Sequence, residues 1–336
     1  MAALVTGGAG FIGSHLCEAL VARGERVIIL DDLSTGSVNN IRHLRSHPRV
    51  ECHFESMMDR SLLCVLVDEA EVVYHLAAAV GVRRIIESPV RTIETNVKGT
   101  ELVLECASKK KKAVFIASTS EVYGKATKAA FREDDDIVLG PSSRSRWSYA
   151  TSKLLDEFLA LAYWKEKNVP VVIGRLFNTV GPRQTGRYGM VLPTFVRQAL
   201  DGDPLTVFGD GRQTRCFGYV KDVVESILRL VACPAAVGEV VNVGNDQEIS
   251  IEDLARIVRE RAQSVSPIRF VSYDQAYAPG FEDMQRRVPS LEKLAVLTGF
   301  RPTTELKVIV DEVIAYFRTR KTESSAPATA LVSTAA

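Results

Sequence analysis

Short apolar stretches alternate with amphipathic helical patterns through the first half of the chain. Strands are expected at 2–6, 26–30, 50–54, 71–75, 113–118 and 170–175, and helices at 12–23, 37–45, 60–68, 92–109 and 149–167. Because strands that alternate with helices form βαβ units, this pattern predicts an α/β fold of the Rossmann type with a doubly wound parallel sheet. Ligands of such sheets bind beyond the carboxyl ends of the strands.

The pattern becomes less regular after residue 178. Helices are expected at about 191–201, 221–232, 250–262 and 305–320, between segments rich in Pro, Gly and Arg. We therefore expect a nucleotide-binding domain of residues 1–178 and a smaller C-terminal substrate-binding lobe of residues 179–320, with a return strand to the main sheet near 239–243. Residues 321–336 are predicted to be a disordered tail because the last stretch is rich in Ser, Ala and Thr.

Composition excludes several classes of function. The net charge of the 336 residues is +1, which argues against a nucleic-acid partner, and the basic run Lys109–Lys112 is interpreted as a solvated helix end. No apolar run is long enough to span a membrane, and the chain enters a strand at once, so no signal peptide is expected. The six cysteines have no metal-binding or redox spacing. We expect mostly buried thiols, no metal site and a cytoplasmic protein.

The first strand runs into glycines at positions 7, 10 and 13, and a helical pattern follows. Glycines let the backbone turn tightly and approach a pyrophosphate, which then binds at the helix N-terminus. The second strand ends in Asp31 and Asp32. An acidic residue at this distance accepts hydrogen bonds from the adenosine ribose, and its charge would repel a 2′-phosphate. The loop therefore predicts an NAD site.

Tyr149 and Lys153 stand four residues apart at the start of a helical pattern, so their side chains share one face. A free phenol is a poor base at neutral pH, but a nearby ammonium favours the phenolate and is expected to lower its pKa. Such a tyrosine can take a proton from a sugar hydroxyl while a hydride leaves the same carbon. The pair therefore predicts an oxidation step.

Several motifs occur in one order along nearly the whole chain: Thr6–Gly13, His75–Ala78, Asn96, Ser118–Gly124, Tyr149 with Lys153, and Arg175–Asn178. Together they resemble the extended short-chain dehydrogenase/reductase family, whose members modify nucleotide sugars. The resemblance covers about residues 2–318. It implies that NAD is held by Gly7, Gly10, Phe11, Ile12, Gly13, Asp31, Asp32, Leu76, Ala77, Ala78, Asn96, Tyr149 and Lys153. Ser56 stands where many members have Asp, and could accept a hydrogen bond from the adenine amine.

The same resemblance implies roles at the substrate. Thr119 would bind the sugar 4-hydroxyl beside Tyr149, and Asn178 would hold the nucleotide phosphate. Arg215 and Arg287 match positions that reach the sugar and the diphosphate. Arg183 and Arg187 are further candidates for substrate contact, whereas Arg144 and Arg146 are interpreted as solvated loop charges.

The residues after Thr119 bear on the reaction. Ser120 and Glu121 resemble the pair of the UDP-glucuronate decarboxylases, which implies loss of carbon dioxide from a 4-keto intermediate, with Arg215 orienting the carboxylate. The segments 80–84 and 181–184 resemble the 4-epimerases instead. A 4,6-dehydratase would need an Asp acid after Thr119, and this chain has Ser120 there instead. A regulator that only senses NAD would lack the Tyr149/Lys153 pair, which this chain has. The predicted function is decarboxylation of UDP-glucuronate, with a UDP-hexose 4-epimerase as the alternative.

The helix 149–167 carries more apolar surface than a single core face needs, and the helix 92–109 carries Val97, Leu102, Leu104 and Ala107. The resemblance implies a four-helix contact between two subunits. We therefore expect a homodimer through these two helices.

Overall fold

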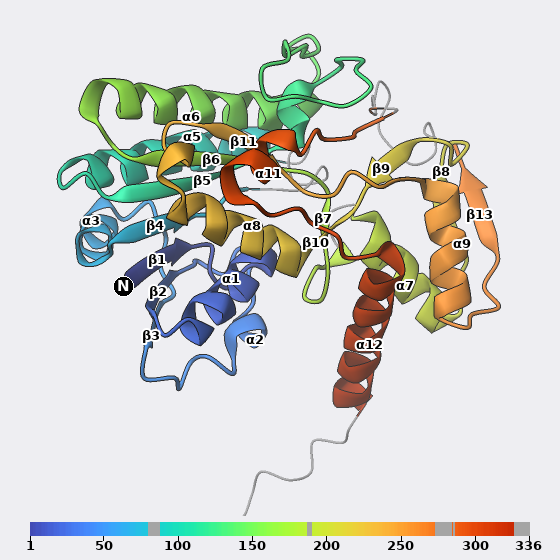
Figure 1. The fold of residues 1–336 in the computed structure, drawn as a ribbon. Coiled ribbons are helices and arrows are strands. Elements are labelled where there is room, and N and C mark those ends of the chain that lie inside the picture. Colours follow the sequence, from blue (N-terminus) through green and yellow to red (C-terminus); the bar gives the residue numbers. More distant parts are fainter. Residues whose placement is uncertain (80–87, 187–189, 273–283, 285, 326–336) are drawn as a thin grey trace, which may run out of the picture.

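The computed structural model describes residues 1–79, 88–186, 190–272, 284 and 286–325. Its centre is a seven-stranded sheet in the order β11-β6-β5-β4-β1-β2-β3, and every neighbouring pair is parallel (Figure 1). The strands are β1 (Ala2–Thr6), β2 (Arg26–Leu30), β3 (Val50–His53), β4 (Val72–His75), β5 (Ala113–Thr119), β6 (Val171–Leu176) and β11 (Val240–Val243). The predicted doubly wound α/β sheet is confirmed, and the edge strand β11 is the one expected near 239–243.

The order of the strands reverses between β1 and β4. The chain runs from β1 through β2 to β3 on one side, and then adds β4, β5 and β6 on the other. Thr6, the last residue of β1, is in register with Leu30 on β2 and with His75 on β4. The loops that follow these three strands therefore meet at the switch point of the sheet, where a ligand is expected.

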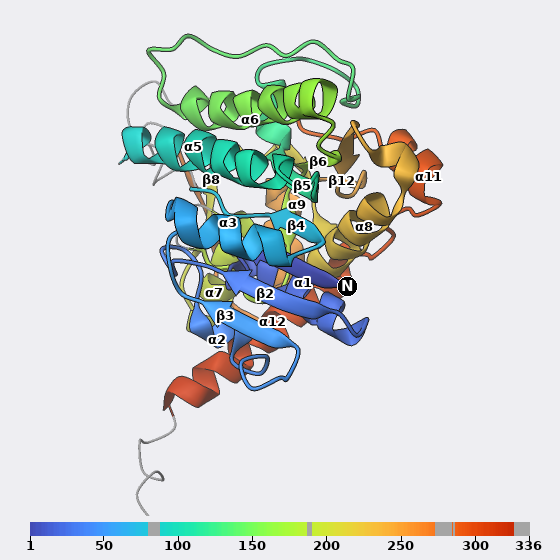
Figure 2. The ribbon, with the colours of Figure 1, turned by 90° about the vertical axis from the view of Figure 1, so that its left-hand side faces the viewer.

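Helices cover both faces of the sheet. One face packs against α1 (Phe11–Ala22), α8 (Val220–Ala232) and α11 (Glu292–Thr298), and the other against α3 (Arg60–Glu69), α5 (Pro89–Ser108) and α6 (Arg146–Lys167). Figure 2 shows α3, α5 and α6 side by side. In β1, Ala3 and Val5 enter one core while Leu4 enters the other. Burial on both faces explains why the strands read as continuous apolar runs.

A smaller C-terminal region has a core of its own, and includes Phe195, Leu254 and Val310. Its main elements are α7 (Val191–Asp201), β8 (Leu205–Phe208), α9 (Ile251–Arg261), β13 (Ile268–Val271) and α12 (Leu306–Ser325). Short strands complete it, in the pairs β7 (Thr179–Val180) with β10 (Gly218–Tyr219) and β9 (Thr214–Cys216) with β12 (Glu248–Ser250). Phe11 and Ile12, at the start of α1, pack against this core, so the region borders the glycine loop.

One expectation about secondary structure differs from the structure. Helix α12 continues to Ser325, so residues 321–325 of the expected disordered tail are helical. Lys321 on α12 contacts the end of α7, because its Nζ lies 2.9 Å from Asp201 and donates to the Leu200 carbonyl at 3.2 Å. Residues 326–336, the rest of the expected tail, lie outside the described part. None of the helices that the structure describes is both long and apolar enough to cross a bilayer.

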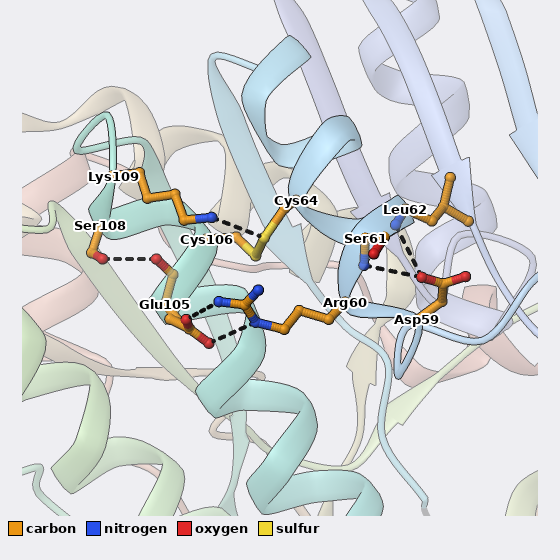
Figure 3. Close-up of a disulfide and its surroundings, with 9 residues drawn as sticks. All are labelled: Asp59, Arg60, Ser61, Leu62, Cys64, Glu105, Cys106, Ser108 and Lys109. Carbon is orange, nitrogen blue, oxygen red and sulfur yellow. Dashed lines mark hydrogen bonds and ion pairs between the residues drawn. A yellow bond between two sulfur atoms is a disulfide. The ribbon is translucent and has the colours of Figure 1, made fainter.

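Cys64 on α3 and Cys106 on α5 form a disulfide, with an S–S distance of 2.02 Å (Figure 3). The expectation of a buried thiol is therefore wrong for this pair. The two residues are 42 positions apart in sequence, and only the packing of α3 against α5 brings them together. Because disulfides are rare in reducing compartments, cysteine usage no longer argues for a reducing cytoplasm. The other four cysteines are free.

Candidate active site

A cavity of about 850 Å³ lies at the carboxyl edge of the sheet, between the switch point and the C-terminal region. Residues from at least five elements contribute to it, so the fold gathers motifs that are far apart in sequence. The predicted site residues that line it are Gly7, Gly10, Phe11, Ile12, Gly13, Asp31, Asp32, Ser56, Leu76, Ala77, Ala78, Thr119, Ser120, Glu121, Tyr149, Asn178, Arg215 and Arg287.

The glycine loop packs too tightly for side chains. Gly7 has a φ of +73°, and a Cβ there would lie 2.8 Å from the backbone N of Ala77. A Cβ on Gly13 would lie 2.1 Å from the Gly7 carbonyl oxygen. The N-cap residue of α1, Gly10, offers no side chain to the free N–H groups of the first turn. These N–H groups border the cavity and can bind an anion there.

The carboxylate of Asp31 joins this loop to the end of β2. Its two oxygens accept hydrogen bonds from the backbone N–H groups of Ala9 at 2.9 Å and Leu33 at 2.8 Å. Burial raises its pKa, while these backbone bonds oppose the shift. Each oxygen keeps a lone pair that could accept from a ribose hydroxyl. The loop, the uncapped helix and Asp31 therefore fit an adenine dinucleotide.

Two predicted cofactor residues lie behind the cavity wall. Asn96 accepts a hydrogen bond from the backbone of Ala79 at 2.8 Å and donates to the Ser152 hydroxyl at 3.0 Å, so it ties the segment after β4 to α6. The ammonium of Lys153 donates to Asp156 at 2.8 Å, and both side chains are almost completely buried. Neither Asn96 nor Lys153 is among the residues that line the cavity.

The environment of Tyr149 differs from expectation. Burial raises the pKa of this phenol above its usual value, and the negative charges of Glu121 and Asp156 raise it further, while a hydrogen bond with Thr119 opposes the shift. The expected lowering by Lys153 is therefore wrong for this structure. The ammonium is paired with Asp156, whose negative charge offsets its effect on the phenol.

Glu121 follows the end of β5 and lines the cavity. Thr119 caps the short 3₁₀-helix η1 (Ser120–Tyr123), because its hydroxyl oxygen accepts from the backbone N–H of Glu121 at 3.2 Å. The Glu121 carboxylate lies 2.7 Å from Arg287 and 3.6 Å from Arg146. Burial acts to raise the pKa of Glu121, but the two guanidinium groups outweigh it and the pKa is lowered. Glu121 is therefore ionised at neutral pH.

Three arginines gather around this one carboxylate. Arg287 also donates to Asn178 at 3.1 Å and lies 3.4 Å from the Ser120 hydroxyl. Arg215 is buried, lines the same cavity and acts on the charge of Glu121. Arg146 completes the set. Three positive charges and one negative charge leave an excess of positive charge, which suits an anionic substrate group.

The other predicted arginines have different positions. Arg183 pairs with Glu18 and donates to the Ser14 hydroxyl at 3.2 Å, so its guanidinium contacts α1 and is not among the residues that line the cavity. Arg187 lies outside the described residues. The interpretation of Arg146 as a solvated loop charge is wrong, since its side chain is largely buried against Glu121.

The sequence also gave no indication of the far wall of the cavity. The C-terminal region contributes polar and aromatic side chains from separate elements, and no shared motif connects them. They include Arg197, Gln198 and Phe208. Among the residues that the structure describes, no group of three or more His, Cys, Asp or Glu side chains could hold a metal ion.

Tyr149 and Lys153 thus lie on the helix that follows β5, at the same edge of the sheet as the glycine loop. This arrangement is that of an extended short-chain dehydrogenase/reductase. Residues 4–313 match the family described as GDP-mannose 4,6 dehydratase. The chain belongs to this family of nucleotide-sugar epimerases and dehydratases, as the sequence motifs predicted.

Characterised relatives support the assignment. The chain is 43% identical over 317 residues to a UDP-N-acetyl-alpha-D-glucosaminuronate decarboxylase of Bacillus cytotoxicus, covering 94% of this chain and 97% of that protein. It is 35% identical to UDP-glucuronic acid decarboxylase 1 of Xenopus tropicalis, covering 94% and 72%. The structure of a UDP-glucuronic acid 4-epimerase from Bacillus cereus, in complex with UDP-glucuronic acid and NAD, superposes with a TM-score of 0.85 at 30% identity, covering 95% and 100%.

Proposed function

We propose that the protein is an NAD-dependent decarboxylase of a UDP-bound uronic acid, either UDP-glucuronate or its 2-acetamido counterpart. The observation that carries this proposal is the cluster of Arg146, Arg215 and Arg287 around Glu121, within one cavity that also holds Tyr149. The sugar of a UDP-hexose is neutral, so the diphosphate is its only anionic group and the sugar gives the excess positive charge nothing to bind. A uronic acid brings a second anionic group for it to bind. The names of the decarboxylase relatives agree with this substrate class.

The reaction would begin at the sugar 4-hydroxyl. Tyr149, hydrogen-bonded with Thr119, is placed to take the hydroxyl proton as the C4–H bond breaks. NAD, held by the glycine loop and Asp31, would supply the hydride acceptor at C4 and can return the hydride later. The product of the first step is a 4-ketone whose neighbouring C5 carries the carboxylate.

Carbon dioxide can leave because the carboxylate is β to this ketone. The C5–CO₂ bond breaks, and its electron pair flows into an enolate with the negative charge on the C4 oxygen. Tyr149 and Thr119 can donate hydrogen bonds to that oxygen as the charge develops. C5 then takes a proton from water. Because Glu121 is ionised, its role is to hold Arg287 against the substrate carboxylate rather than to supply this proton.

The main alternative is a 4-epimerase, in which the ketone turns over and no bond to carbon dioxide breaks. Gln184, from the segment that resembles the epimerases, lines the cavity and donates to the Thr179 carbonyl at 2.8 Å. The other segment with this resemblance, residues 80–84, lies outside the described residues. The epimerase structure from Bacillus cereus also holds a uronic acid. Uronate binding alone therefore does not decide between the two reactions.

Product analysis separates them. The protein is incubated with NAD and, in parallel, with UDP-glucuronate, its 2-acetamido counterpart or UDP-glucose, and the products are followed by NMR. We expect a UDP-pentose or its 4-ketone, with one carbon dioxide released per turnover. A UDP-uronate inverted at C4, formed without carbon dioxide, would contradict decarboxylation and support the epimerase.

We also propose a homodimer through α5 and α6. Both helices keep large apolar side chains on their outer surface: Phe158 is 63% exposed, Val90 69% and Leu155 49%. Burial of such a patch against its copy would remove apolar surface from water. The same two helices pack against each other, so two subunits could form a four-helix contact.

Phe158→Asp should therefore dissociate the dimer. An interface residue of this kind contributes about 2 kcal/mol or more, so dimer affinity should fall by at least about 30-fold. Analytical ultracentrifugation at micromolar protein measures the change. Val296→Asp, at an exposed apolar residue on α11, is the matched control and should stay dimeric. A wild-type protein that sediments as a monomer would contradict the proposal.

A further inference from the structure

Asp156 is a buried acid in the middle of α6. It stands one helical turn after Lys153 and two turns after Tyr149, so all three lie on one face of the helix. Its side chain is 0% exposed, and its Oδ2 lies 2.8 Å from the Lys153 Nζ. A hydrogen bond with Thr100 also acts on this carboxylate.

Packing alone does not account for this carboxylate. A buried ion pair costs desolvation energy that its mutual attraction repays only in part, and an apolar pair of similar size often stabilises a protein as well. Burial accordingly raises the pKa of Asp156, while the charge of Lys153 acts to lower it. Burying this ion pair costs desolvation free energy, which points to a role of Asp156 in the chemistry.

The other described charged groups near Lys153 do not form an ion pair with its ammonium. Glu157 on α6 is held by Arg175 on β6 at 2.8 Å. His75 on β4 is buried, and its pKa is lowered to about 3 by burial and by Lys153, so it is neutral. Glu121 on η1 is paired with Arg287. Among the described groups around Lys153, Asp156 is the one whose carboxylate forms an ion pair with its ammonium.

We infer that Asp156 is a positioning residue: it anchors the Lys153 ammonium and offsets part of its charge, and so sets the pH range in which Tyr149 can take a proton. This inference rests on the proposed oxidation by Tyr149. Burial is the main cause of the raised pKa of Tyr149, and the charge of Asp156 contributes to it after that of Glu121. Removal of the carboxylate would leave the ammonium free to favour the phenolate.

The test is the pH profile of Asp156→Asn, which keeps the shape of the side chain and removes its charge. The activity of a base rises as pH increases through its pKa, so a lower pKa of Tyr149 moves this acid limb to lower pH. For Asp156→Asn we expect the acid limb of the pH profile of kcat/KM to lie roughly one pH unit below the acid limb of the wild type. The assay uses NAD with UDP-glucuronate and, separately, with its 2-acetamido counterpart. Melting temperature checks the fold.

Glu166→Gln is the matched control, because it removes one carboxylate from the exposed face of the same helix and should leave the profile unchanged. If Asp156→Asn does not fold, Asp156→Ser is measured in the same way, and the same shift is expected. Equal loss of activity at every pH, without a shift of the limb, would overturn the inference. Retained activity in Tyr149→Phe would overturn the proposed function instead, so the two failures are distinguishable.

Discussion

Tyr149→Phe should reduce turnover by about 10³-fold, because general acid–base catalysis by a positioned side chain contributes roughly 10²–10⁴-fold. The phenol lies in the cavity, is hydrogen-bonded with Thr119 and shares its helix face with Lys153. The substitution removes only the hydroxyl, so NAD binding should persist. Turnover is measured by NMR and binding by the rise in melting temperature that NAD causes.

Tyr123→Phe is the matched control for this prediction. Tyr123 is fully buried near the end of β5, and its hydroxyl donates to Asn242 at 2.8 Å while its ring stacks on Phe131. It is not among the residues that line the cavity. The control should lose about 1 kcal/mol of stability and little activity. A Tyr149→Phe protein that works at the wild-type rate would exclude the oxidation step.

The fold was predictable because its strands are buried on both faces. Such strands read as unbroken apolar runs, and the six that were expected agree with β1 to β6 to within a residue at each end. The helix α11 was missed because it is only seven residues long and Leu294 is its one fully buried side chain. The Cys64–Cys106 disulfide depends on how α3 packs against α5, which no spacing reveals.

The site was predictable where a motif fixes its own local geometry. The glycine loop and Thr119 are positioned by their own turns, and they line the cavity as a group. Arg146 was missed because α6 was expected to begin at Tyr149, whereas it begins at Arg146. With the correct start, Arg146 lies one turn before Tyr149 and Asp156 two turns after it. Helical spacing alone could then have placed both residues beside the catalytic pair.

Arg287 is different, because it reaches the cavity from a segment far along the chain, and only the resemblance to a family indicated it. In the structure its guanidinium contacts Glu121, Asn178 and Ser120 together. A planar fork can make such contacts at once, whereas a lysine ammonium cannot reproduce their geometry. The position of Arg287 therefore makes a strong test of how the substrate carboxylate is bound.

Arg287→Met should lower kcat/KM for the uronate substrate by about 10²–10³-fold, as expected for loss of one donor that stabilises charge in a buried site. Glu121 would lose its nearest guanidinium and keep the effects of Arg146 and Arg215, so its pKa should rise toward the usual value. NAD binding should be unaffected, because the glycine loop and Asp31 are contributed by β1 and β2. Arg287→Lys should recover part of the loss, because it restores the charge without the fork.

Arg286→Met is the control, since the neighbouring guanidinium is more exposed and pairs with Glu248 at 2.7 Å instead of Glu121. It should keep nearly full activity. If Arg287→Met and Arg286→Met behave alike, then the arginine cluster does not bind the uronate, and the charge argument for a decarboxylase fails. If Arg287→Met instead loses carbon dioxide release but still oxidises C4, then Arg287 directs bond cleavage rather than binding. The substrate carboxylate would then be bound mainly by Arg215 on β9.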